Sequence, residues 1–200
     1  MRKIIAINQV TVDGVMQGPG GSEEDPRNGF NQGGWAMPFF DEALGQALGE
    51  IMAVNFDLLL GRRTYDVFAG YWPNQGMQPI GKAFNKATKY VVTRSPDKLD
   101  WKTSQRVGGD VVDGVRALKA SDGPALHLWG SHQLLQALIA AKLVDEYCML
   151  VYPVVLGKGK RLFESSVPPR RLTLVETSST PQGVLINTYR PGGPVFAAVG

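Results

Sequence analysis

Short apolar runs that stop at a glycine and pass directly into a helical pattern recur along this chain. In the clearest case, residues 56–60 form a mostly apolar run, Gly61-Arg62-Arg63-Thr64 follow, and a helix is expected as far as Tyr71. Residues 125–129 lead in the same way through Gly130-Ser131 into a second helix, with Ser131 as its expected cap. Strands that alternate with helices are typical of an α/β sheet with parallel, right-handed connections.

Further elements follow from the same kinds of pattern. Strands are predicted at residues 3–12, 89–95 and 145–156, helices from Pro38 to about residue 52 and from the N-cap Asp110, and a connector at residues 73–81. Residues 172–178 and 183–190 alternate apolar and polar residues across a Pro-Gln-Gly turn, which predicts an antiparallel hairpin. We therefore expect a three-layer α/β/α sandwich on a mixed sheet, as one domain over residues 1–190 with a loose tail at 191–200.

The composition argues against several other classes of protein. The 200 residues are 44% hydrophobic, which is enough for a core without disulfide or metal staples. One cysteine and two histidines argue against a metal centre, and Cys148 and His127 are expected in the core. The net charge of +3 comes from scattered Lys and Arg, which argues against nucleic-acid binding. Without a signal peptide or an apolar stretch of about 20 residues, we expect a cytoplasmic protein that does not bind membranes.

A glycine-rich segment at residues 14–36 interrupts the alternation of strands and helices. It carries seven glycines and two prolines, with three consecutive acids at residues 23–25. Loops of this length inside a compact domain are usually functional or disordered. The aromatic residues Trp35, Phe39 and Phe40 follow, and they either wall a pocket for a flat ring or pack in the core, which is the usual place for such residues.

Residues suited to binding phosphate follow three of the predicted strands. They are Gly61-Arg62-Arg63-Thr64, Thr93-Arg94-Ser95 and Gly130-Ser131. In open α/β sheets ligands bind at the carboxyl ends of the strands, where helix N-termini also attract anions. Arginine and hydroxyl groups gathered there suit a polyanionic dinucleotide, including one with a 2′-phosphate. Each motif alone has an ordinary alternative, a helix start with solvated arginines.

Several motifs occur together in one order along the chain. They are Asp13-Gly14, Leu-Gly-Arg-Arg-Thr-Tyr at 60–65, Val-Val-Thr-Arg-Ser at 91–95, Trp-Gly-Ser at 129–131, Leu-Val-Asp-Glu at 143–146 and Pro-Val-Val-Leu-Gly-Lys-Gly at 153–159. With this ordered set the chain resembles the dihydrofolate reductase-like superfamily. Within that superfamily it is most similar to the reductase domain of riboflavin-biosynthesis deaminase/reductase proteins and their stand-alone bacterial relatives. The resemblance spans about residues 3–190.

The resemblance implies NADPH as the cofactor and assigns residues to its parts. The turn Gly61-Arg62-Arg63-Thr64 would hold the phosphates of NADPH. Arg62 would lie nearest the 2′-phosphate, and Arg63 and Thr64 would lie nearer the pyrophosphate. Thr93, Arg94 and Ser95 would lie at the 2′-phosphate and Gly130, Ser131 and His132 at the pyrophosphate. Asn8, Gln9 and the loop after Gly14 would lie at the nicotinamide, and Trp129 is a further cofactor-binding residue. The family usually has a Gly-Gly pair, with a cis peptide in dihydrofolate reductase, where this chain has Trp129-Gly130. A homodimer is also implied.

Two acids are candidates for a catalytic or substrate-binding role. Asp41 lies in the helix after the long loop, where dihydrofolate reductases use an acid to bind the pterin. Asp13 lies after the first strand, where an acid can orient substrate or a water of the loop. Both acids also have an ordinary explanation, because an acid in a first turn complements the helix dipole and Asp-Gly forms turns.

These features together predict an NADPH-dependent reductase. Hydride would pass to a C=N or C=O carbon, with the proton coming from water. The resemblance implies the substrate, which would be a ribosylaminopyrimidine, as for a 5-amino-6-(5-phosphoribosylamino)uracil reductase, or a pteridine-like compound. The alternative is a nucleotide-binding protein of the same fold without turnover.

Overall fold

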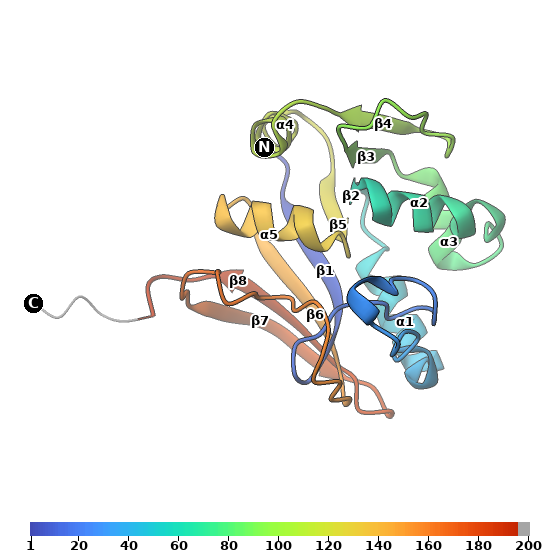
Figure 1. Ribbon diagram of the computed structural model, residues 1–200, viewed down its shortest axis with the longest axis vertical. Helices are drawn as coiled ribbons and strands as arrows, with labels where there is room; N and C mark the ends of the chain where they lie inside the picture. The colour runs from blue at the N-terminus through green and yellow to red at the C-terminus, as the bar shows by residue number, and fades with distance from the viewer. Residues whose placement is uncertain (196–200) are drawn as a thin grey trace, which may run out of the picture.

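The computed structural model describes residues 1–195, which form one eight-stranded sheet with helices on both faces (Figure 1). The strands are β1 (Ile4–Thr11), β2 (Phe56–Gly61), β3 (Lys89–Val92), β4 (Ser104–Val107), β5 (Ala125–Trp129), β6 (Glu146–Tyr152), β7 (Leu172–Ser179) and β8 (Leu185–Pro191). The α-helices are α1 (Glu42–Ile51), α2 (Arg62–Tyr71), α3 (Pro79–Lys86), α4 (Val111–Ala120) and α5 (His132–Ala140). Short 3-10 turns are η1 (Arg27–Gly29), η2 (Met37–Phe39) and η3 (Trp72–Asn74). The predicted α/β class is confirmed.

The sheet is mixed, with strand order β4-β3-β2-β5-β1-β6-β8-β7. In this order, all neighbouring strands from β4 to β6 are parallel to each other. The pairs β6–β8 and β8–β7 are antiparallel. The parallel part follows from crossovers that mostly carry a helix, and the antiparallel part from the tight turn between β7 and β8. The predicted mixed sheet with a C-terminal hairpin is confirmed.

Apolar side chains on the two faces of the sheet form separate cores. In β2, Leu58 and Leu60 belong to the core covered by α1, α2 and α3, whereas Leu59 belongs to the core covered by α4 and α5. Successive strand side chains point to opposite faces, so a strand covered on both faces reads as a continuous apolar run. All three leucines are 0% exposed. The sequence signal at this strand therefore reflects its burial on both faces.

Two short elements are absent from the sequence prediction. The helix α3 lies where a connector is expected, because it is only eight residues long and opens on Pro79. The strand β4 lies at the edge of the sheet and carries the largely polar run Ser-Gln-Arg-Val without buried residues. Elements this short and this polar give no clear periodicity.

Three predicted boundaries are wrong by several residues, each for a local reason. The helix expected from Pro38 begins at Glu42, because Pro38 belongs to the 3-10 turn η2. The strand β3 ends at Val92, and Thr93 Oγ1 then accepts the Ser95 N–H at 3.0 Å in a turn. The strand β6 ends at Tyr152 because Pro153 follows and has no N–H for the ladder.

His127 and Cys148 are buried, as predicted. His127 stacks on Phe56 with ring centroids 4.3 Å apart, and burial lowers the pKa of its imidazole to about 4. Burial raises the pKa of the Cys148 thiol to about 11. Among the described residues, no helix is long and apolar enough to cross a membrane. Of the predicted tail, residues 196–200 lie outside the described part of the chain.

A buried ion pair joins the segment before β1 to β2. The side chain of Arg2 is 1% exposed, pairs with Asp57 and donates to the Pro124 carbonyl at 2.7 Å. We expect Arg2→Ala to lower the free energy of unfolding by about 3–5 kcal/mol, because it leaves a largely buried carboxylate without its partner. Urea denaturation measures the change.

The control is Lys3→Ala in the next position. The Lys3 side chain is 60% exposed and pairs with Glu146 at 2.9 Å. Exposed pairs contribute little, so this variant should lose less than about 1 kcal/mol. Equal losses in Arg2→Ala and Lys3→Ala would contradict a special role for the buried pair.

Candidate functional site

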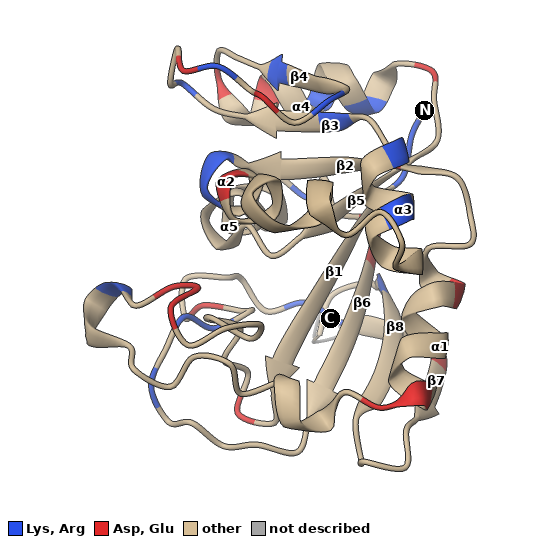
Figure 2. Ribbon diagram, turned by 90° about the vertical axis from the view of Figure 1, so that its right-hand side faces the viewer, with Lys and Arg blue, Asp and Glu red and all other residues tan. Residues whose placement is uncertain are grey.

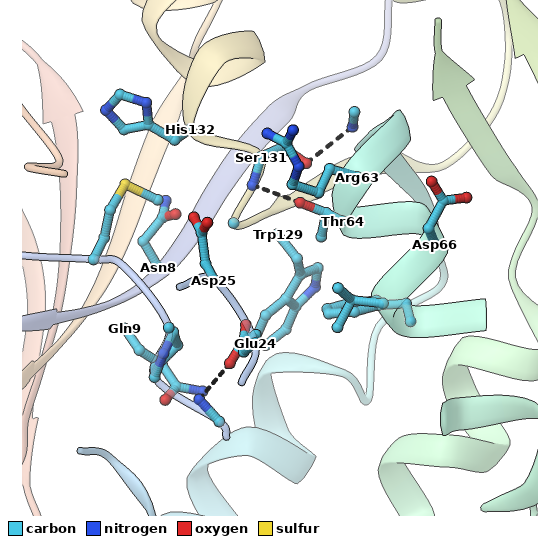
Figure 3. A pocket seen from close by; sticks show the side chains of 18 of the residues that line it. Asn8, Gln9, Glu24, Asp25, Arg63, Thr64, Asp66, Trp129, Ser131 and His132 are labelled. Atoms are coloured by element: carbon cyan, nitrogen blue, oxygen red, sulfur yellow. Dashed lines mark hydrogen bonds between the residues drawn. The ribbon is translucent and has the colours of Figure 1, made fainter. Parts of the chain in front are cut away.

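A cavity of about 1350 Å³ lies between the carboxyl ends of β2, β3 and β5 and the glycine-rich loop (Figure 3). Its wall also includes residues of β1, η2, α1, α2 and α3. The volume exceeds the roughly 300–1,000 Å³ typical of a site for one small molecule. The carboxyl ends of parallel strands are where open α/β sheets bind ligands.

All of the predicted cofactor residues except Ser95 line this cavity. They come from β1 (Asn8, Gln9), the start of α2 (Gly61, Arg62, Arg63, Thr64), the end of β3 (Thr93, Arg94) and the segment before and into α5 (Trp129, Gly130, Ser131, His132). The structure therefore brings together residues that the sequence placed at separate strand ends. Ser95 lies outside the lining, and its hydroxyl donates to the carboxylate of Asp97.

Two hydrogen bonds, here called the latch, tie the start of α2 to the start of α5. The backbone N–H of Gly61 donates to Ser131 Oγ at 2.9 Å, and the backbone N–H of Ser131 donates to Thr64 Oγ1 at 3.0 Å (Figure 3). Gly130 and Ser131 have left-handed backbone, with φ of +51° and +54°, and the Trp129–Gly130 peptide bond is trans. Ser131 is the N-cap residue of α5, as predicted, but its side chain makes no capping bond, because its hydroxyl accepts from the Gly61 N–H instead.

One end of the cavity, here called the basic end, consists of Gly61, Arg62, Arg63, Thr64, Arg94, Gly130 and Ser131. Arg62 is held by Asp66 at 2.8 Å and by the carbonyl of Asp97 at 3.3 Å. The exposed side chains of Arg63 and Arg94 make no hydrogen bond or ion pair with any residue from 1 to 195. The first turn of α2 contains no acid, and Figure 2 shows its basic residues together. Free guanidinium groups beside a helix N-terminus form a site for an anion.

The other end, here called the apolar end, consists of Met37, Phe40, Val67, Phe68, Tyr71, Trp72, Ile80 and Phe84. Met37, Phe40 and Tyr71 are 57%, 56% and 50% exposed, although all three are large and apolar. Of the aromatic residues after the loop, Phe40 walls the cavity, as one of the two interpretations predicted. Trp35 and Phe39 instead pack edge-on against Tyr152.

Neither predicted catalytic acid lines the cavity. The Asp41 carboxylate caps its own helix and accepts a backbone N–H of α1 at 2.8 Å. Asp13 accepts the backbone N–H groups of Leu156 and Gly157 at 3.2 and 2.8 Å and so holds the turn after β6. The structure supports the ordinary explanation for both residues, because each carboxylate is used for a cap or a turn.

Acidic residues of the glycine-rich loop line the cavity without having been singled out by the sequence pattern. Glu24 Oε2 accepts the Gly20 N–H at 2.5 Å, and burial raises the pKa of the Glu24 carboxyl group (Figure 3). Asp25 pairs with Arg27 and Lys160, each at 2.5 Å. The three consecutive acids at residues 23–25 were the signal in the sequence for these lining residues. Acidic side chains are mostly exposed and solvated, so this run alone did not indicate a site.

Gln17 fixes the loop that carries these acids. Its side chain donates to the carbonyls of Asp25 and Arg27 at 2.9 and 3.1 Å and accepts the Lys160 N–H at 3.1 Å. Trp35 Nε1 donates to the Gln17 carbonyl at 2.8 Å. Gln17 is 4% exposed, so these bonds are shielded from water. The loop therefore forms a defined wall of the cavity.

Three further observations describe the polar groups that line the cavity. His132 Nε2 lies 3.0 Å from the carboxylate of Glu164, and burial lowers the pKa of the imidazole. Asn8 Oδ1 and Trp129 Nε1 are buried and have no hydrogen-bond partner within the described residues, whereas buried polar atoms usually have one. In the same part of the chain, no group of three or more His, Cys, Asp or Glu side chains is arranged to hold a metal ion.

The two bonds of the latch should act as one network. Ser131→Ala leaves the Gly61 N–H without its acceptor and should lower the free energy of unfolding by about 1–3 kcal/mol. Thr64→Val should cost a similar amount, and the double variant should cost less than the sum of the two. Urea denaturation of the three variants measures this coupling.

Thr177→Val serves as the control, because it removes a hydroxyl that is bonded to Asn187 at 2.6 Å on the exposed hairpin. A surface substitution of this kind should change stability by no more than about 0.5 kcal/mol. Strictly additive costs of Ser131→Ala and Thr64→Val would show that the two bonds are independent.

Comparison with known proteins gives one family and one fold. The family model of the RibD C-terminal domain matches residues 2–186. The uncharacterized protein YyaP of Bacillus subtilis (strain 168) is 27% identical over 196 residues, or 96% of each chain. A putative riboflavin biosynthesis protein from Shewanella sp. PV-4 has a TM-score of 0.65 at 19% identity, covering 95% of this chain and 99% of that one. Dihydrofolate reductase from Enterococcus faecalis, complexed with NADP(H) and RAB-propyl, has a TM-score of 0.59 at 16% identity, covering 94% and 96%. The predicted dihydrofolate reductase-like fold is confirmed.

Proposed function

The chain belongs to the RibD C-terminal domain family, and from this membership and its cavity we propose that it is an NADPH-dependent reductase. The observation that carries the proposal is the pair of guanidinium groups of Arg63 and Arg94, neither of which has a hydrogen-bond or ion-pair partner within residues 1–195. They follow neighbouring parallel strands, β2 and β3, and border the same cavity. A 2′-phosphate distinguishes NADPH from NADH, and free arginines are the side chains that recognise it.

The residues at the basic end fit the phosphates of NADPH. We assign Arg63, Thr64 and the N–H groups in the first turn of α2 to the pyrophosphate, because a helix N-terminus favours phosphate. Arg94 and Thr93 are assigned to the 2′-phosphate. Arg62 is already bound to Asp66, so we expect it to contribute less than the two free arginines. The dihydrofolate reductase with the same fold was solved with NADP(H).

The chain's own side chains would bind and orient the reactants. NADPH, when bound, supplies the hydride. We place the nicotinamide beside Asn8 and Gln9, because Asn8 Oδ1 is an acceptor that has no hydrogen-bond partner within the described residues. The glycine-rich loop, which forms part of the cavity wall, would exclude water from this region. Glu24 is the loop carboxyl group with the raised pKa, and it can hold a proton at Oε1, the oxygen not bonded to Gly20.

The substrate class follows from family membership and the cavity. We propose that hydride passes to a C=N or C=O carbon of a ribosylaminopyrimidine or a pteridine-like compound. The alternative, a nucleotide-binding protein without turnover, is favoured by the position of Asp13 and Asp41 outside the cavity. NADPH that binds but is not consumed in the presence of either substrate class would support this alternative.

Removal of a free arginine should affect NADPH more than NADH. We expect Arg94→Ala to weaken NADPH binding by about tenfold or more, because a charge-assisted hydrogen bond contributes about 1.5–3 kcal/mol. NADH lacks the 2′-phosphate, so its affinity should change little. Isothermal titration calorimetry with both cofactors measures the two dissociation constants.

Arg116→Ala is the matched control for this experiment. Arg116 is exposed on α4, pairs with Asp113 and lies outside the cavity lining. Its removal should leave the affinity for both cofactors unchanged. Equal weakening of NADPH and NADH by Arg94→Ala would refute the assignment of Arg94 to the 2′-phosphate.

We also propose that the protein acts in the cytoplasm as a homodimer. The hairpin supports the second part, because β7 is an edge strand on which Leu174 and Val175 are 50% and 45% exposed. Exposed apolar edges are commonly covered by a second chain. Light scattering after size-exclusion chromatography should give twice the mass of 21.7 kDa, and the mass of a monomer would refute the dimer.

A further inference from the structure

The face of α2 that lines the cavity changes from basic to apolar along the helix. Arg63 and Thr64 stand in the first turn, and Val67, Phe68 and Tyr71 follow on later turns. Residues three or four positions apart share a helix face, so Thr64, Val67, Phe68 and Tyr71 form one stripe. At a rise of 1.5 Å per residue, Tyr71 lies about 10 Å further along the axis than Thr64. One cavity therefore has two ends of different chemistry.

The rings of the apolar end form a continuous wall. Trp129 contacts Phe84 with ring centroids 5.4 Å apart, and Phe84 contacts Phe68 at 5.5 Å and Trp72 at 5.1 Å. Tyr71 extends the wall by its contact with Trp72 at 4.9 Å. Aromatic rings pair well with other flat rings in stacked or edge-on arrangements. Phe84 and Trp129 are 1% and 7% exposed and form the buried backing of this wall. Tyr71, which is 50% exposed, and the partly buried Phe68 and Trp72 are the rings that can contact a flat ligand.

A second apolar surface enters the same cavity from η2. Met37 and Phe40 line the cavity and keep more than half of their surface exposed, at 57% and 56%. Apolar side chains gathered at an open surface usually mark a binding site. The two surfaces together offer apolar contacts to one ligand.

The cations that line the cavity are either at the basic end or already paired. Arg27 and Lys160 both bind the Asp25 carboxylate at 2.5 Å, and Glu24 contributes a second carboxylate from the same loop. Within the described residues, a phosphate on the substrate would thus find no unpaired cation away from the basic end. Moving a phosphate from water to an apolar surface without a partner is costly.

We propose that the apolar end binds a flat, uncharged ring compound without a phosphate group as the hydride acceptor. This inference rests on the proposed function, in which the cofactor occupies the basic end. The volume of about 1350 Å³ leaves room for a second molecule beside the cofactor. The substrate is thereby narrowed to compounds without phosphate, which excludes phosphorylated ribosylaminopyrimidines.

Naphthol and naphthyl phosphate test the proposal, because they share a flat ring and differ in the phosphate. Their fluorescence reports binding to the protein saturated with NADP⁺, which keeps the probes away from the basic end. We expect naphthol to bind at least about tenfold more tightly than naphthyl phosphate, because the apolar end cannot compensate the phosphate charge. Equal or tighter binding of naphthyl phosphate overturns the inference and leaves the proposed function standing. Failure of NADP⁺ to bind, measured first by calorimetry, overturns the proposed function and the inference with it.

Two methionines provide matched variants. Met37 lines the apolar end, whereas Met77 is 99% exposed and lies outside the cavity lining. We expect Met37→Ala to weaken naphthol binding by about threefold to tenfold, as removal of a partly buried apolar side chain does. Met77→Ala should leave the affinity for naphthol unchanged, and both variants should bind NADP⁺ normally.

Phe40→Leu, which removes a ring and keeps an apolar side chain, is a second variant at the apolar end. Unchanged naphthol affinity in both Met37→Ala and Phe40→Leu overturns the inference.

Discussion

The latch between Gly61, Ser131 and Thr64 fixes the geometry on which the cavity depends. β2 and β5 are neighbours in the sheet, and the latch joins the two turns directly beyond their carboxyl ends. The N-termini of α2 and α5 are thereby held against the same space. The left-handed backbone at Gly130 and Ser131 presents both the N–H and the hydroxyl of Ser131 to its neighbour. The basic side chains of α2 are thereby held beside the turn that precedes α5.

Sequence patterns predict the central fold well because its strands are buried on both faces. β2 and β5 are short, almost fully buried and bounded by small residues, so burial alone makes them recognisable. β4 and α3 escape prediction because their form depends on neighbours. β4 is a polar edge strand that exists through its pairing with β3, and α3 is a short helix that packs Phe84 into the core. The sequences of β4 and α3 carry no strong local preference for a strand or a helix, so they do not reveal these elements.

The basic end of the site was predictable because it is built from contiguous motifs at strand ends. Gly61 to Thr64 and Gly130-Ser131 meet through the sheet order, which the strand–helix alternation already implies. Of the apolar end, only Phe40 was placed at a pocket wall by one of the two interpretations of the sequence. The rest was not predictable, because Met37 and Tyr71 come from segments whose relation depends on tertiary packing. The same limit applies to Asp13 and Asp41, which lie outside the lining of the cavity. The sequence shows that Asp41 opens a helix, but only the packing shows that its carboxylate serves the helix itself.

The division of the cavity along α2 has a consequence for how proteins of this design diversify. The backbone of the basic end is constrained by the sheet and the latch, so substitutions at Gly61, Thr64 or Ser131 disturb the fold as well as the site. Met37, Phe40 and Tyr71 are each at least half exposed, so substitutions there cost little stability. Selection can therefore explore new specificities at one end of the cavity while the anion site at the other is inherited intact. In such a scaffold, neutral substitutions accumulate at the apolar end, where new substrate specificities can arise. They are rarer at the junction that holds the basic end, where the anion binds.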